Sequence, residues 1–129
     1  ERDLDPLQRL HKFLEWMLPL TERDREREAG RIALNTMRGE KSVDHFFDAI
    51  DRRMRELIAA HLGPFVAPQD LPQAVDFLRA CTNGVALSTV EHPEQWTKAR
   101  QLAVIETALR GLGLDKSQMT GSKPSALSA

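Results

Sequence analysis

The side chains best suited to acid–base or metal chemistry in this chain of 129 residues are its four histidines. They are His11, His45, His61 and His92, and each lies on a different predicted element. No Glu-x-x-His, His-Glu-x-x-His or Cys-x-x-Cys pattern occurs, so no spacing sets two ligands on one helix face. His45, between two aspartates, is interpreted as solvent-facing, and a helix dipole favours His61 near a helix end. We therefore expect no metal ion and no cofactor.

Nucleophilic catalysis would fall to the single cysteine, Cys81. Its immediate neighbours supply no base to activate the thiol, and a small buried side chain is the simpler role. Glycine-rich phosphate loops are absent as well, because Gly84 is isolated and Gly111-Leu-Gly closes a predicted helix instead of opening one. We predict no catalytic residue and no enzymatic activity.

Composition excludes further classes of protein. The net charge of −1 gives no basic surface of the kind that nucleic-acid-binding domains carry. With 41% hydrophobic residues the chain can bury a core, and we expect one domain over residues 1–113. No stretch reaches the length of a membrane span, and a lone cysteine suits a reducing compartment, so we expect a cytoplasmic protein. The sequence opens without a signal peptide or an initiator methionine, and we expect it to be a piece of a longer protein.

The elements that must position these side chains are helices, because the apolar residues follow helical spacing nearly throughout. Five are predicted, over about residues 6–18, 21–38, 42–62, 70–91 and 94–112. Thr21 and Ser42 are predicted N-caps, while Pro19 and Gly63 end the helices before them. No strand-like alternation and no internal repeat occurs, so the fold class is all-α. Residues 114–129 lack periodicity and are predicted to form a mobile tail.

The second predicted helix begins with a charged run, Glu22–Glu28. Its i,i+3 pairs have opposite signs and its i,i+4 pairs have the same sign, so the two effects largely cancel. We interpret the run as a solvated turn of helix and expect the buried stripe of this helix only from Ala29 onward.

Aromatic, sulfur-containing and branched apolar side chains are spread over four of the predicted helices. Core packing accounts for most of them, but Asn35, Thr36, Thr82 and Asn83 bring polar groups to inward-capable positions nearby. A mostly apolar cavity with a few convergent polar groups is typical of a small-molecule pocket. The predicted pocket residues are Phe13, Trp16, Met17, Ile32, Asn35, Thr36, Phe46, Phe47, Ile50, Met54, Phe77 and Cys81.

Residues 80–90 contain no charge, in a chain of which 29% is charged. A helix without a charged face is usually enclosed on both sides. The last predicted helix adds a stripe of small side chains, next to a stripe of larger ones that can seat it on its own core. A twofold contact between two copies would cover both surfaces. The predicted dimer-interface residues are Thr82, Val85, Thr89, Ala103, Val104, Thr107, Ala108 and Gly111.

The order of these segments resembles a known family. The apolar run from Phe77 to Leu87 holds the pair Asn83-Gly84, and His92-Pro-Glu and a last amphipathic helix follow it. This arrangement is similar to the C-terminal domain of tetracycline-repressor-type (TetR family) regulators, whose penultimate helix carries an Asp/Asn-Gly pair and then Asp-Pro-Glu. His92 departs from that pattern by one residue. Upstream, residues 5–26 resemble the early ligand-domain helices of the family and their charged turn.

The resemblance covers about residues 5–113 and implies a five-helix orthogonal bundle. It also implies a homodimer in which the last two helices of each copy form a four-helix bundle, with a small-molecule effector pocket inside the domain. A helix-turn-helix domain ahead of residue 1 would contact DNA, and this chain would meet DNA only through it. The leading hypothesis is therefore the effector-binding and dimerisation domain of a bacterial repressor, with no membrane partner, in which the first helix transmits the ligand signal.

Two alternatives remain open at this point. The first is a helical protein–protein interaction module that binds no ligand. The second is a small all-α enzyme that holds an anionic substrate with arginines such as Arg31 or Arg38, which requires those arginines to be buried and to converge on the pocket.

Overall fold

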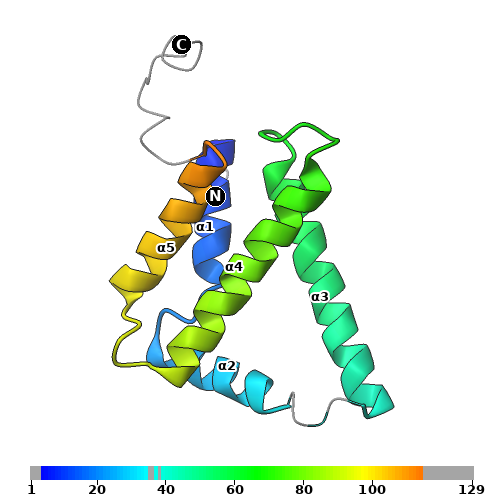
Figure 1. The fold of residues 1–129 in the computed structure, drawn as a ribbon, viewed down its shortest axis with the longest axis vertical. Helices are drawn as coiled ribbons and strands as arrows, with labels where there is room; N and C mark the ends of the chain where they lie inside the picture. Colours follow the sequence, from blue (N-terminus) through cyan, green and yellow to red (C-terminus); the bar gives the residue numbers. More distant parts are fainter. Residues whose placement is uncertain (1–3, 35–36, 38, 115–129) are drawn as a thin grey trace.

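The computed structural model describes residues 4–34, 37 and 39–114, and this part of the chain folds into five α-helices (Figure 1). These are α1 (Pro6–Trp16), α2 (Glu22–Leu34), α3 (Lys41–Leu62), α4 (Leu71–Glu91) and α5 (Lys98–Gly111). The described residues contain no strand, and the prediction of an all-α fold is confirmed.

Helix α4 is the central element of the bundle. It packs against α2, α3 and α5, and α1 packs against α3. In Figure 1, α1 and α5 lie to one side of α4 and α3 lies to the other, while α2 runs across the end of α4 that leads into the last loop. Each long helix therefore contributes one face to a shared core, and α2 is the most peripheral of the five.

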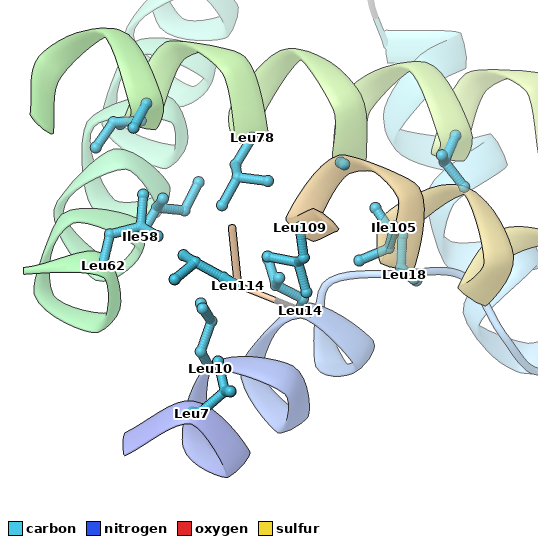
Figure 2. Close-up of a cluster of buried hydrophobic side chains, with 14 residues drawn as sticks. Leu7, Leu10, Leu14, Leu18, Ile58, Leu62, Leu78, Ile105, Leu109 and Leu114 are labelled. Atoms are coloured by element: carbon cyan, nitrogen blue, oxygen red, sulfur yellow. The ribbon is translucent and has the colours of Figure 1, made fainter. Parts of the chain in front are cut away.

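Leucine side chains fill the space between α1, α4, α5 and the C-terminal end of α3 (Figure 2). Leu10, Leu14, Ile58 and Leu109 are fully buried there. Buried residues of this cluster repeat every three or four positions along a helix, as Leu7, Leu10 and Leu14 do on α1. This spacing presents one apolar stripe to the core. Leu114, which the sequence assigned to the mobile tail, is buried in the same cluster, so the folded part extends one residue further than predicted.

Two polar side chains tie α5 to the α1 region from within the core. The Gln101 amide is fully buried, and its Nε2 donates to the carbonyl oxygens of Pro19 at 3.1 Å and Trp96 at 3.2 Å. His11 is buried on α1, and its Nδ1 lies 3.2 Å from a carboxylate oxygen of Glu106 on α5. Buried polar groups of this kind fix relative positions because breaking them leaves unpaired atoms away from water.

The caps of α1 and α2 explain where these helices begin. The Asp5 carboxylate accepts from the backbone of Gln8 at 2.8 Å, and the Gln8 side chain accepts from the backbone of Asp5, which completes a capping box. Thr21 caps α2 as predicted, since its hydroxyl accepts from the backbone of Asp24 at 3.1 Å. Helix α1 ends at Trp16, two residues earlier than predicted.

Two predicted helix starts are wrong. Helix α3 begins at Lys41 with Glu40 in the N-cap position, so Ser42 lies inside the helix. Helix α5 begins at Lys98 instead of residue 94, because the Thr97 hydroxyl caps it by accepting from the backbone of Arg100 at 3.2 Å. Gly113 ends α5 with a positive φ of 79°, a conformation that glycine adopts without strain.

Candidate ligand cavity and exposed apolar face

A cavity of about 270 Å³ lies between the end of α1, α2, the middle of α3 and α4. Trp16, Met17, Ile50 and Met54 form its apolar wall, and all four were predicted to line a pocket. The structure thus brings together predicted residues from two helices that are more than thirty positions apart in sequence. The remaining lining residues are Arg27, Glu28, Arg31, Arg79, Thr82, Asn83 and Ala86.

Two of these arginines are partly buried and paired with acids. On α2, Arg31 donates to the Glu28 carboxylate through Nε at 2.9 Å and also through Nη2. On α4, Arg79 is only 13% exposed and donates through Nε to the Asp51 carboxylate of α3 at 2.9 Å. Asp51 is 49% exposed and does not line the cavity. The counter-ion of Arg79 therefore sits outside the cavity, whereas Arg79 itself contributes to the cavity wall.

Three of the predicted pocket residues do not line this cavity. Phe13 stacks on the His61 ring, with centroids 4.4 Å apart and planes within 4°. It lines an open groove on the far side of α1, which it shares with Trp16. Phe77 is exposed and lines a separate groove near the end of α5. Cys81 packs against the leucine core. Their helices place these side chains on faces that do not meet the cavity.

The other predicted pocket residues also lie outside the cavity wall. Phe46 and Phe47 contact one another edge to face near the start of α3, with ring centroids 5.5 Å apart. Ile32 is half-buried on α2 and does not line the cavity. Asn35 and Thr36 lie outside the described residues. The predicted set thus covers the apolar wall and extends too far along α2 and α3.

Arg27 and Glu28 are absent from the predicted pocket because the run at the start of α2 was interpreted as solvated, and Arg31 was named only in the enzyme alternative. Arg27 and Arg31 are four residues apart and share one face of α2, and Arg79, Thr82 and Ala86 share one face of α4. The sequence contains this spacing, but helical spacing alone does not predict that these faces of α2 and α4 would pack next to each other.

Burial raises the pKa of the Cys81 thiol above its usual value of 9.0. A thiol with a raised pKa is mostly protonated at neutral pH and is a poor nucleophile. The structure therefore agrees with the interpretation of Cys81 as a packing residue.

A second surface feature occupies another side of α4. Phe77, Ala80, Gly84 and Leu87 are exposed and recur at intervals of three and four residues. On α5, the exposed residues Ala103, Thr107 and Gly111 recur every four residues. Phe77 and Gly111 line one common groove, so the two rows meet on the same side of the molecule. We call these seven residues the α4–α5 apolar face.

The structure corrects half of the predicted dimer-interface residues. Thr82, Val85 and Thr89 on α4 and Ala108 on α5 are buried inside the subunit, because α4 and α5 turn these side chains toward their own core. Thr82 lines the cavity instead, and the Thr89 hydroxyl donates to the carbonyl of Val85 at 2.8 Å. Side chains with so little exposed surface have nothing to offer a partner. Of the remaining predicted residues, Val104 is half-buried, and Ala103, Thr107 and Gly111 belong to the α4–α5 apolar face.

The described residues hold no group of three or more histidine, cysteine or acidic side chains placed to bind a metal ion. None of the helices in this part of the chain reaches the combination of length and apolar character that crossing a bilayer requires.

The five-helix, all-α fold is that of the C-terminal domain of a TetR-family transcriptional regulator. More particularly, the family model for the C-terminal domain of BetI-type transcriptional repressors matches residues 6–114, and the chain belongs to this family. Neither a curated protein nor a solved structure matches the chain. The match begins and ends within a residue of the resemblance found in the sequence, and it makes the chain part of a regulator.

Proposed function

We propose that this chain binds a small-molecule effector and dimerises, so that the ligand controls DNA binding by a bacterial repressor in the cytoplasm. The observation that carries the proposal is the division of α4 into separate faces. Arg79, Thr82 and Ala86 face the cavity, whereas Ala80 and Gly84 belong to the exposed apolar face. One rigid helix would therefore be in contact with both the ligand and the partner subunit.

The dimer contact follows from the composition of the α4–α5 apolar face. Leu87 is 43% exposed, and its neighbours on this face include alanine and glycine but no charged residue. Small side chains let two helices approach closely, and a self-complementary face is satisfied by a twofold axis. Two copies of α4 and α5 would then form a four-helix contact, as the family resemblance implies.

The cavity is placed to act on α1, the helix expected to lie nearest the DNA-binding domain. Trp16 and Met17, at the end of α1, form part of its wall. The loop that follows is held to α5 by the hydrogen bond from Gln101 to the Pro19 carbonyl. A ligand that contacts Trp16 and α4 together can change their relative position only by the difference in its affinity for the two arrangements.

Sedimentation of matched variants tests the dimer. Leu87→Glu places a charge in the α4–α5 apolar face and is expected to convert the dimer to a monomer. Phe46→Glu is the matched control, because Phe46 is 44% exposed but lies on α3 away from this face. A wild-type chain that sediments as a monomer at micromolar concentration overturns the dimer proposal.

The alternative of an interaction module without a ligand makes a different prediction. A compound that binds the folded state raises the melting temperature in proportion to its occupancy. A screen of small organic molecules is expected to yield compounds whose stabilisation disappears when Met54→Trp fills the cavity. If no compound stabilises the chain, the interaction module is the better description.

The family is one of regulators, so the arginines of the cavity are assigned to binding and not to catalysis.

A further inference from the structure

Two ion pairs join α3 to α4 beside the cavity. Arg79 of α4 pairs with Asp51 of α3, and Arg55 of α3 pairs with Asp76 of α4. We call these four residues the α3–α4 latch. Building on the proposed effector cavity, we propose that the latch controls how far this cavity opens. When the two pairs break, the part of α3 that precedes them moves away from α4 and widens the entrance for a ligand.

The order of the charges selects one register between the two helices. An acid precedes a base on each helix, by four residues on α3 and by three on α4. The pairs join the first member on one helix to the second on the other, so the helices run antiparallel at the latch. A slip by one turn would set either the two arginines or the two aspartates opposite each other, and like charges repel. The latch therefore stabilises one packing of α3 on α4 and disfavours the neighbouring ones.

The latch borders the wall of the cavity. Ile50 and Met54, which line the cavity from α3, lie next to Asp51 and Arg55 in the sequence of the same helix. On α4, Arg79 belongs to both the latch and the wall. Because one turn of helix moves as a rigid unit, any displacement of the latch residues of α3 carries Ile50 and Met54 with it. Opening the latch therefore separates the α3 side of the cavity from the α4 side.

Burial along α3 places a pivot beyond the latch. Ile58 and Leu62, near the C-terminal end of α3, are fully buried in the leucine cluster. Before the latch, Val43 is the one buried residue of this helix. Figure 1 shows a matching division, since α3 and α4 approach each other near the loop that joins them and diverge toward the start of α3. Apolar packing thus fixes one end of α3, and the latch lies where the two helices begin to diverge.

The exposure of the latch suits a contact that opens and closes. Asp51 is 49% exposed and Asp76 is 61% exposed, so water can solvate both carboxylates when the pairs break. Ion pairs of this kind are weak, and salt screens them. Arg79 is only 13% exposed, and a largely buried guanidinium is costly to leave unpaired. The closed state is therefore preferred, but a ligand with a modest preference for the open state can shift the balance.

A distance measurement across the cavity half tests the latch in the whole chain. Spin labels are attached at His45→Cys, near the start of α3, and at Glu91→Cys, at the end of α4, since both positions are exposed. Cys81→Ser removes the native thiol, and an excess of unlabelled chain ensures that a dimer carries one labelled copy. Double electron–electron resonance then gives the distance distribution. We expect one main distance at low salt and a growing population at longer distance as the salt rises to about 1 M.

The decisive variants exchange charges without changing the net charge. Asp51→Arg/Arg55→Asp sets like charges opposite each other at both pairs, and we expect it to raise the open population at least about threefold at low salt. Adding Asp76→Arg/Arg79→Asp restores both pairs in reverse and is expected to restore the closed distance.

The matched control is Arg53→Glu/Glu56→Arg. It exchanges an ion pair that lies within α3 and does not reach α4, so we expect the distance to stay as in wild type. Circular dichroism confirms that each variant is folded before it is labelled. If a charge variant does not fold, the salt series on the wild-type chain decides.

The outcomes separate the latch from the proposed function. A distance that depends neither on salt nor on the exchange of charges in α3 overturns the latch. Equal opening in the control variant also overturns it, because the charges would then act through the stability of α3 alone. Both results leave the effector cavity and the dimer standing, since sedimentation and the Met54→Trp variant test those separately. Opening that the second exchange reverses supports the latch even if the compound screen finds no ligand.

Discussion

The bundle has two halves that differ in what holds them together. In the core half, α1, α5, the C-terminal end of α3 and the adjoining face of α4 bury a continuous cluster of leucines and other apolar residues (Figure 2). In the cavity half, α2 has no buried residue at all, and only Val43 is buried in the first two-thirds of α3. The cavity half is instead linked to α4 by the ion pairs of Arg79 with Asp51 and Arg55 with Asp76.

The contrast between the two halves indicates where the proposed ligand would act. Apolar burial contributes about 25 cal/mol per Å², so the leucine cluster is expected to dominate the free energy of folding. Ion pairs that remain partly exposed contribute only about 0–1 kcal/mol each. The cavity half therefore belongs to the less stable part of the molecule, where a modest binding energy can reorganise helices while the core half stays intact.

The largest expected contrast comes from truncating one large side chain in each half. Leu109→Ala in the core is expected to lower the free energy of unfolding by about 2–5 kcal/mol, because Leu109 is fully buried among leucines. Met54→Ala beside the cavity is expected to lower it by about 1 kcal/mol, since its side chain is half-buried and borders space that is already empty. Urea denaturation measures both. Equal losses would mean that the two halves do not differ in stability.

Native-state hydrogen exchange gives a finer view of the same contrast. Amides of α2 are expected to exchange by local opening, with a free energy below that of global unfolding, because no side chain of α2 is buried. Amides in the middle of α4 and α5, near Leu78 and Ile105, are expected to exchange only by global unfolding. Uniform protection of all helices would contradict this view.

The sequence predicted the core half better than the cavity half. Leucine repeats such as Leu10 and Leu14 match the period of a helix. They therefore predict a buried helix face even when the helices that pack against it are unknown. The cavity depends on how α2 packs against α4, and the helical period of the sequence does not predict that packing. For this reason the predicted pocket residues include Met54 but not Arg27 and Arg79 beside it, and Arg31 was named only in the enzyme alternative.

The same limit applies to the residues predicted for the dimer interface. An uncharged helix offers two apolar sides, and period alone does not say which side the subunit itself covers. The covered side proved to be that of Thr82, Val85 and Thr89, and the exposed side that of Ala80 and Gly84. Tertiary packing of α4 on α5 and α2 makes the choice.

Two glycines offer a smaller, matched comparison of the halves. Gly30 of α2 and Gly84 of α4 both lie inside helices with no atom within 4 Å of an added Cβ. Replacing glycine by alanine in an open helix interior gains about 1 kcal/mol.

Gly30→Ala is expected to show this gain as slower hydrogen exchange within α2. Gly84→Ala is expected to gain less, because Gly84 belongs to the face proposed to contact a partner closely, and its gain should grow when the chain is diluted toward monomer. Equal gains at all concentrations would argue against close approach at Gly84.

The smallest expected effect concerns Cys81, which lies on α4 and packs against the core cluster. Because burial raises its pKa in the folded state, the protonated thiol is favoured by folding. Its contribution to stability is therefore fully present below the pKa of the unfolded thiol and is lost as the pH rises through the raised value, above 9.0.

At neutral pH, iodoacetamide should alkylate Cys81 more slowly than a free thiol, since the thiolate is the reactive form. If the cavity half opens alone, the half-buried Cys81 stays packed on the core, and opening of α2 should not accelerate its alkylation. Alkylation as fast as the exchange of α2 amides would show instead that α4 separates from the core whenever α2 opens, and the two halves would then be one cooperative unit.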